Sequence, residues 1–167
     1  MAAQRARASR GTLVKTSLAV TAAAAAGGIA TRPDSSWFES LDKPSWQPPP
    51  PVFGLVWTPL YGLIAWAGAR ALDSASEPAE RAGVRRAFGW NLALNTAWTP
   101  LFFTARAPRA ALAEVLALNA ANAVLMRRVW RADRRAGMML VPYVGWTAFA
   151  TALNTAIVRR NPRGRRS

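Results

Sequence analysis

The sequence contains no cysteine and no histidine. The chain therefore forms no disulfide, and it cannot build thiolate or imidazole metal sites, histidine-based catalytic triads, or haem ligation by these two residue types. Acidic residues are also scarce, with 8 Asp and Glu against 22 Lys and Arg. Few acid–base enzyme mechanisms remain with this inventory, and we expect neither a cofactor nor a metal site.

Basic residues are gathered in blocks at residues 5–10, 81–86, 127–135 and 159–166, and the runs between them are nearly free of charge. This alternation is typical of a protein that crosses a membrane several times, with its cations near the headgroups. A sequence pI near 11.9 also suits RNA binding. The tryptophans, however, lie inside the uncharged runs, whereas base-stacking surfaces need aromatic and basic residues together. We therefore expect the lipid bilayer as a partner and no nucleic acid.

Five runs approach the roughly 20 apolar residues that cross a membrane. They predict an all-α membrane protein, a bundle of five transmembrane helices in a domain of residues 12–160, between basic tails at 1–11 and 161–167. The expected spans are 12–31, 51–72, 87–105, 108–129 and 136–158. The first run also resembles a secretory signal peptide, but its Ala, Gly, Ser and Thr content suits packing against further helices, which favours an uncleaved helix.

Amides, phenols and aromatic rings recur on single faces of several expected spans. Asparagines in a membrane helix either bond to neighbouring helices or mark a site, and aromatic rings either fill a core or line a pocket for a flat ligand. Periodicity alone favours the packing interpretation. The residues concerned are Phe53, Trp57 and Tyr61 in the second span, Asn91, Asn95, Trp98 and Phe102 in the third, Asn119 and Asn122 in the fourth, and Tyr143, Trp146, Phe149, Ala150 and Asn154 in the fifth.

Three stretches together carry a family resemblance: WFESLDKPSWQPPPPVFGLVWTPLY at 37–61, NLALNTAWTPLFF at 91–103 and PYVGWTAFATALN at 142–154. In this order they resemble the translocator protein and tryptophan-rich sensory protein family, also called peripheral benzodiazepine receptor-like. The resemblance implies a bundle of five transmembrane helices, commonly paired as a homodimer, around a pocket that binds tetrapyrroles such as protoporphyrin.

The resemblance also implies which residues line the pocket, among them Trp46 in the first loop. Some family members are reported to degrade porphyrins in light, so two functions stay open: a membrane receptor, transporter or sensor for tetrapyrroles, or a porphyrin-degrading enzyme. The absence of histidine and cysteine favours the first. With the aromatic and amide faces, the candidate ligand-binding residues are Trp37, Trp46, Phe53, Trp57, Tyr61, Asn91, Asn95, Trp98, Trp146, Phe149, Ala150 and Asn154.

Two positions depart from the family pattern. Asn91 stands where the family often has glutamine, and this shorter amide reaches less far. The sterol motif of animal members needs a tyrosine soon after the LN of the fifth span, and Thr155 occupies that place here. The resemblance therefore does not extend to sterol recognition through this motif.

The segment KPSWQPPPP at 43–51 joins the first two expected spans and is stiffened by its prolines. One interpretation makes it a lid that holds Trp46 over the bundle, with Trp37 assisting and Lys43 meeting a ligand carboxylate. The other makes Trp46 an interfacial anchor and Pro48–Pro51 the start of the second helix.

The homodimer that the resemblance implies needs a contact face. Small residues four apart let two membrane helices approach closely. The candidates are Gly83, Ala87, Ala93 and Ala97, together with the alanine-rich first span.

Overall fold

The computed structural model describes residues 8–162, and all regular structure in this part of the chain is helical. Residues 1–7 and 163–167 of the predicted basic tails lie outside the described residues. The long helices are α1 (Arg10–Ala30), α3 (Pro50–Ser74), α4 (Pro78–Thr99), α5 (Pro108–Ala132) and α7 (Val141–Arg160). The short ones are α2 (Ser36–Glu39), the π-helix η1 (Pro100–Thr104) and α6 (Arg134–Met139).

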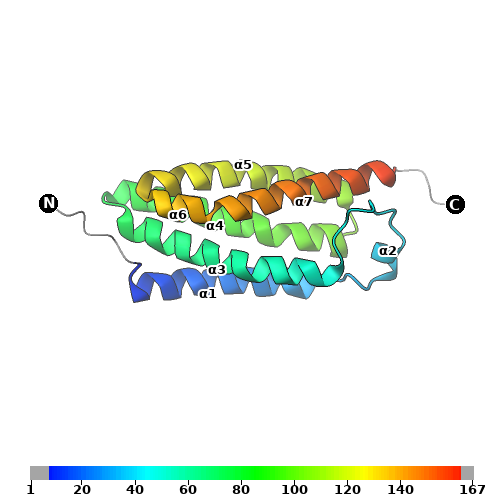
Figure 1. Cartoon of the computed structure of the whole chain (residues 1–167), viewed down its shortest axis with the longest axis horizontal. Helices are drawn as coiled ribbons and strands as arrows, with labels where there is room; N and C mark the ends of the chain where they lie inside the picture. The colour runs from blue at the N-terminus through cyan, green and yellow to red at the C-terminus, as the bar shows by residue number, and fades with distance from the viewer. Residues whose placement is uncertain (1–7, 163–167) are drawn as a thin grey trace.

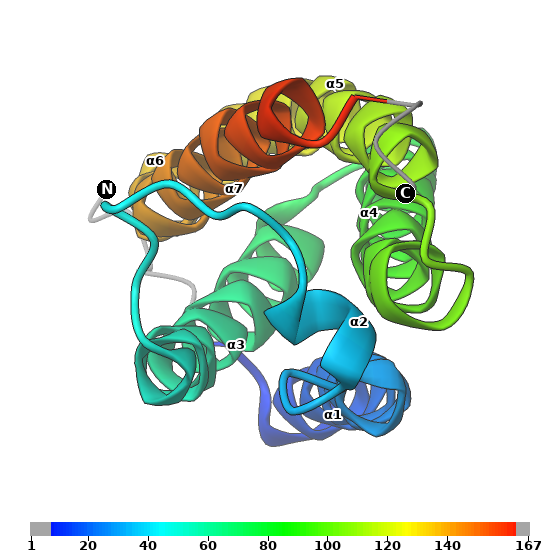
Figure 2. The ribbon, with the colours of Figure 1, turned by 90° about the vertical axis from the view of Figure 1, so that its right-hand side faces the viewer.

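The long helices lie side by side in an elongated bundle, with α2 at one end (Figure 1). Viewed along the bundle, α1 and α3 form one side and α5 and α7 lie opposite (Figure 2). Helix α4 packs against both α5 and α1 and so closes the ring. The all-α class predicted from the sequence is confirmed.

Within residues 8–162, four stretches are long and apolar enough to cross a membrane: α1, α3, α5, and α6 together with α7. The chain is therefore an integral, multi-pass membrane protein, as predicted. Helix α4 differs because its first turns carry Arg81, Arg85 and Arg86, and only its later part and η1 cover the predicted span 87–105. Composition therefore identifies four of the five predicted spans.

Prolines mark the starts of four of the five long helices, α3, α4, α5 and α7. Pro50, Pro78 and Pro108 each lie in the first turn of a helix. The backbone amides of this turn have no acceptor within the helix, so a proline costs no hydrogen bond there. Pro142 likewise lies in the first turn of α7. The predicted span 136–158 is therefore divided between α6 and α7.

Helix α4 widens at its end. Pro100 has no amide hydrogen to offer the carbonyl of Thr96, and its ring crowds that carbonyl. The backbone continues as a π-turn, in which the amide of Ala105 donates to the carbonyl of Pro100 over 2.9 Å. Arg106 then adopts a left-handed conformation with a φ of 51°, and the chain reverses into α5.

The half of the bundle away from α2 is densely packed around α3. Ala67, Ala69 and Ala71 of this helix are fully buried, and such small side chains let neighbouring helices approach closely. One close approach is at Gly68, where a Cβ atom would lie 2.6 Å from Cε2 of Phe88 on α4. The ring of Phe88 therefore occupies the space that a side chain at Gly68 would need.

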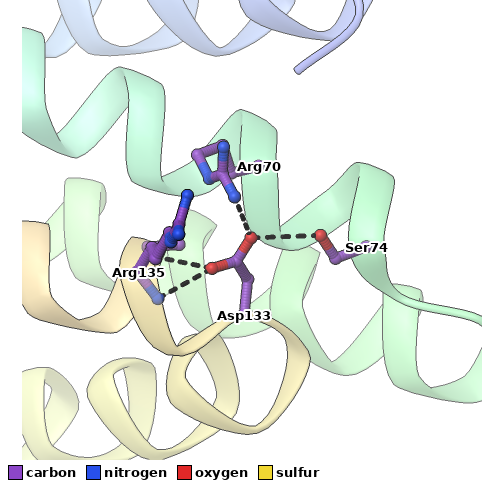
Figure 3. A network of polar contacts seen from close by, with 5 residues as sticks. Arg70, Ser74, Asp133 and Arg135 are labelled. Atoms are coloured by element: carbon purple, nitrogen blue, oxygen red, sulfur yellow. Dashed lines mark hydrogen bonds and ion pairs between the residues drawn. The ribbon is translucent and has the colours of Figure 1, made fainter. Parts of the chain in front are cut away.

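An ion pair ties α3 to the junction between α5 and α6 (Figure 3). Arg70 donates to Oδ2 of Asp133, and the Ser74 hydroxyl donates to the same oxygen over 3.4 Å. Oδ1 of Asp133 accepts from the amides of Arg135 over 2.8 Å and Ala136 over 3.1 Å. Burial raises the pKa of the Asp133 carboxyl, but these hydrogen bonds and the Arg70 charge outweigh burial and hold the pKa below its usual value.

Candidate functional site

The half of the bundle next to α2 is hollow. It contains a cavity of about 510 Å³, bounded by the end of α1, the first half of α3, the end of α4 with η1, part of α5, and α7. In this half the alanines of α3 give way to aromatic residues, and Phe53 meets Trp146 of α7 edge-on, with ring centroids 5.8 Å apart. The volume lies within the range of about 300–1,000 Å³ that is usual for pockets of small organic ligands.

Two pairs of stacked rings form separate parts of the cavity wall. On α3, the rings of Trp57 and Tyr61 stack with centroids 5.0 Å apart. On α4 and η1, the rings of Trp98 and Phe102 stack with centroids 4.9 Å apart. All four residues border the cavity. Their arrangement offers apolar aromatic surface to a flat ligand from two different helices.

A chain of hydrogen bonds beside the cavity joins α4, α5 and α7. The Tyr143 hydroxyl donates to Oδ1 of Asn91 over 3.0 Å, and Nδ2 of Asn91 donates to Oδ1 of Asn122. Nδ2 of Asn122 in turn donates to the Thr147 hydroxyl over 2.8 Å. Tyr143, Asn91 and Asn122 are buried, and an unpaired polar group is costly inside a membrane. The network therefore fixes the three helices relative to one another.

Two further amides lie at the cavity wall and are held there by protein groups. Nδ2 of Asn95 donates to the Tyr143 hydroxyl over 3.3 Å. Asn154 accepts from the indole N–H of Trp98 over 3.2 Å and donates to the carbonyl of Pro108 over 2.8 Å. The asparagines thus bond helix to helix, as one interpretation of their spacing held, while Asn95 and Asn154 also border the cavity.

Known proteins with similar sequences identify the family of this chain. The family model described as "TspO/MBR family" matches residues 16–160. The chain belongs to this family. The family assignment confirms the resemblance noted in the sequence and places the chain in a membrane sensor and receptor family.

Relatives of this TspO/MBR protein come from bacteria, archaea and animals. The tryptophan-rich sensory protein of Cereibacter sphaeroides is 39% identical over 150 residues, which cover 89% of this chain and 91% of the relative. The tryptophan-rich protein TspO of Archaeoglobus fulgidus is 35% identical over 156 residues, covering 89% and 96%. The translocator protein of Homo sapiens is 36% identical over 126 residues, covering 75% of each chain.

Most of the candidate residues of this TspO/MBR protein lie at the cavity wall. Asn91 does not, because its amide is turned into the buried network, where its shorter side chain reaches both Tyr143 and Asn122. Trp37 packs edge-on against Phe102, with centroids 5.6 Å apart, and does not border the cavity either. The candidates that do border it are Phe53, Trp57, Tyr61, Asn95, Trp98, Trp146, Ala150 and Asn154.

Trp46 also lies outside the cavity wall. Its ring meets that of Phe149 edge-on at 5.7 Å, and 48% of Trp46 is exposed. Phe149, which does not border the cavity, stacks on Trp146, which does, with centroids 5.2 Å apart. Trp46 therefore contacts the wall from its outer side, through Phe149.

The connector between α1 and α3 is attached to α2 and to α7. The Lys43 ammonium donates to the carbonyls of Phe38 over 2.6 Å and Glu39 over 3.1 Å. Lys43 thus binds the end of α2. The sequence had led us to expect that it would meet a ligand carboxylate instead. The side-chain amide of Asn161, just after α7, accepts from the amide of Asp42 over 3.0 Å and donates to its carbonyl over 2.9 Å. These contacts hold the connector across the α2 end of the bundle.

Some cavity residues were not predicted from the sequence. The residues from α1 carry neither an amide nor a ring, so nothing in their pattern distinguishes them from ordinary packing residues. Gln47 directly follows the predicted Trp46, but a turn at Ser45 and Trp46 sets the direction of its side chain, so spacing along the sequence gives no signal for it. The additional lining residues include Ala24, Gly27, Gly28 and Thr31 of the first helix region, Phe38 and Gln47 of the connector, and Thr147 of α7.

Proposed function

We propose that this TspO/MBR protein binds a tetrapyrrole such as protoporphyrin, or a similar flat amphiphile, in its cavity and acts as a membrane receptor, transporter or sensor. The cavity carries the proposal, because it measures about 510 Å³ and is lined by stacked aromatic pairs. Flat rings pack well against such surfaces, and a few polar groups at the edge fix their orientation.

The test is a titration of the purified protein in detergent with protoporphyrin IX in darkness. Trp57, Trp98 and Trp146 border the cavity, so binding there quenches tryptophan fluorescence saturably. Saturation at one porphyrin per chain is the expected result. Quenching that rises linearly with porphyrin, without saturation, would refute binding in the cavity.

A porphyrin-degrading enzyme is the second candidate. It is favoured by the position of Trp98 and Trp146 at the wall, where a bound ring would contact oxidisable indoles. The same titration, repeated in light, separates the two functions. A bilin-like product that forms in light and disappears in Trp146→Phe supports the enzyme, and unchanged porphyrin in light supports the receptor.

We also propose that α4 with η1 forms a fifth membrane span. Residues 87–104 contain no charged residue, and the arginines that precede them lie at the same end of the bundle as the arginines at the end of α5. Cations at this level pair with lipid headgroups. Cysteines introduced at Ser76 and Arg106 test the span, because a membrane-impermeant thiol reagent should label them from opposite sides.

The partner arrangement that we propose is a homodimer through α4. Among the small residues expected at the contact, Ala93 is exposed, and so is the neighbouring Trp90. Gly83 is not available, because Nη1 of Arg128 lies 2.9 Å from the place where its Cβ would be. Ala93→Leu should shift the protein from dimer to monomer in detergent, and an unchanged dimer would place the interface elsewhere.

A further inference from the structure

The connector directs two neighbouring side chains to different places. Trp46 lies against Phe149 outside the cavity wall, whereas Gln47 borders the cavity. A turn holds this geometry, because the amide of Gln47 donates to the carbonyl of the buried Pro44 over 3.0 Å. The prolines from Pro48 onward restrict the backbone on the other side. The direction of the Gln47 side chain is therefore set by the connector itself.

The side-chain amide of Gln47 has no hydrogen-bond partner in the described part of the chain. Its Oε1 atom is buried and unpaired. Its Nε2 atom makes no hydrogen bond to another residue within 8–162 and, unlike Oε1, keeps accessible surface. Polar groups of native proteins are nearly always paired, with protein groups, water or a ligand. Gln47 borders the cavity, so the free N–H groups of Nε2 can donate to a ligand there.

The other amides of the cavity wall are already engaged. Asn154 uses both its oxygen and its nitrogen in bonds to Trp98 and Pro108. Asn95 uses its nitrogen in a bond to Tyr143. Among the cavity amides of residues 8–162, Gln47 thus has the largest hydrogen-bonding capacity left for a ligand.

We propose that Gln47 is a specificity-determining residue, which selects ligands that carry a hydrogen-bonding group on their edge. The ligand class is a flat aromatic amphiphile with a peripheral carboxylate, to which Nε2 of Gln47 donates. The inference rests on the function proposed above and adds to it the group of the ligand that is recognised. A carboxylate fits because hydrogen bonds from an amide to an ionised acceptor are stronger than neutral ones.

The test compares two porphyrins with the same flat ring. Protoporphyrin IX carries carboxylates, and octaethylporphyrin carries only alkyl groups. Gln47→Met keeps the length of the side chain and removes the amide. We expect Gln47→Met to bind protoporphyrin IX about tenfold or more weakly and to bind octaethylporphyrin at least as well as the wild type does. The melting temperature of the empty protein should not fall, because the variant removes an unpaired buried amide oxygen.

Two further variants keep the result interpretable. Gln47→Leu repeats the apolar change with another shape, in case Met alone perturbs the fold. Ser45→Ala changes an exposed residue of the same connector and should leave both affinities within about twofold.

Unchanged affinity for protoporphyrin IX in both Gln47 variants, or an equal loss for both porphyrins, overturns the role of Gln47 and leaves the proposed function intact. A wild-type protein that binds neither porphyrin overturns the proposed function, and the role of Gln47 falls with it.

Discussion

The hydroxyl of Tyr143 on α7 serves two amides of α4 at once: it donates to Oδ1 of Asn91 over 3.0 Å and accepts from Nδ2 of Asn95 over 3.3 Å. Tyr143 and Asn91 are essentially unexposed. Inside a membrane bundle no water is at hand to form these hydrogen bonds if a protein partner is lost. One hydroxyl therefore holds the buried network and an amide of the cavity wall in their positions.

Removal of this hydroxyl in Tyr143→Phe should destabilise the protein by about 1–3 kcal/mol, because it leaves buried amide groups unpaired. Tyr61→Phe is the matched control, since no hydrogen bond joins the Tyr61 hydroxyl to another described residue. Thermal melting of both variants in detergent checks the prediction. Equal melting temperatures for the two variants would mean that the Tyr143 hydroxyl contributes nothing to the folded state.

The contact between α3 and α4 at Gly68 predicts an effect of a single methyl group. In Gly68→Ala the new Cβ would lie 2.6 Å from Cε2 and 3.0 Å from Cζ of Phe88, and overpacking of this kind costs about 1–3 kcal/mol. At Gly62 in the same helix a Cβ meets no atom within 4 Å. Gly62→Ala should therefore be neutral or stabilising by up to about 1 kcal/mol. Melting curves in detergent that order the two variants the other way would contradict this packing.

Ala150→Thr tests the cavity through α7. Ala150 borders the cavity, so the larger side chain crowds the ligand and should weaken porphyrin binding about tenfold or more, the equivalent of roughly 1–3 kcal/mol. Ala152→Thr makes the same change at an exposed position of the same helix and should leave affinity unchanged. The measurements are porphyrin titrations and the melting temperatures of the empty proteins. Equal affinity with a lower melting temperature for Ala150→Thr would place this residue between helices.

The ion pair at the packed end predicts a pH dependence of stability. The folded pKa of Asp133 lies below its usual value of 3.8, so its contribution is fully present above pH 3.8 and is lost as the pH falls through the lower folded value. At neutral pH, Asp133→Asn should cost about 1–3 kcal/mol, and this difference from the wild type should shrink below about pH 4.

The matched control for the pH experiment is Asp42→Asn. The Asp42 side chain is 59% exposed in its pair with Arg160, and exposed pairs contribute little. Melting temperatures measured from pH 7 to pH 3 decide the matter. A difference between wild type and Asp133→Asn that stays constant over this range would rule out ionisation of Asp133 as its origin.

The parts of the site that the sequence predicts are those with a repeating chemical signal. Asn95, Trp98 and Asn154 recur at helical spacing with other polar and aromatic residues, and all three border the cavity. The spacing of residues predicts which of them share a face of a helix, but it does not predict which other helix that face meets at each height in the bundle. Asn91 shares a face with Asn95, yet at its level α5 and α7 lie close enough to take both ends of its amide.

Other parts could not be predicted, because they depend on what stands across the bundle. Gly27 and Gly28 line the cavity because α1 passes beside it. Nothing in the sequence of this alanine-rich helix indicates that these two glycines lie at a cavity. Trp46 was expected over the cavity and lies on Phe149, because the turn closed by Gln47 and Pro44 decides which side each connector residue faces. Turn geometry of this kind is not encoded in spacing.

At the π-turn Pro100–Thr104, the number of residues matters more for the position of the following helix α5 than the identity of their side chains. The turn holds one residue more than an α-helical turn, so the chain leaves it rotated by about 100° relative to an uninterrupted α-helix. That rotation sets where α5 begins and brings the carbonyl of Pro108 to Asn154, 2.8 Å away. In the course of divergence, side chains within the turn can be exchanged one for another, whereas the loss of a single residue would swing the start of α5 away from α7.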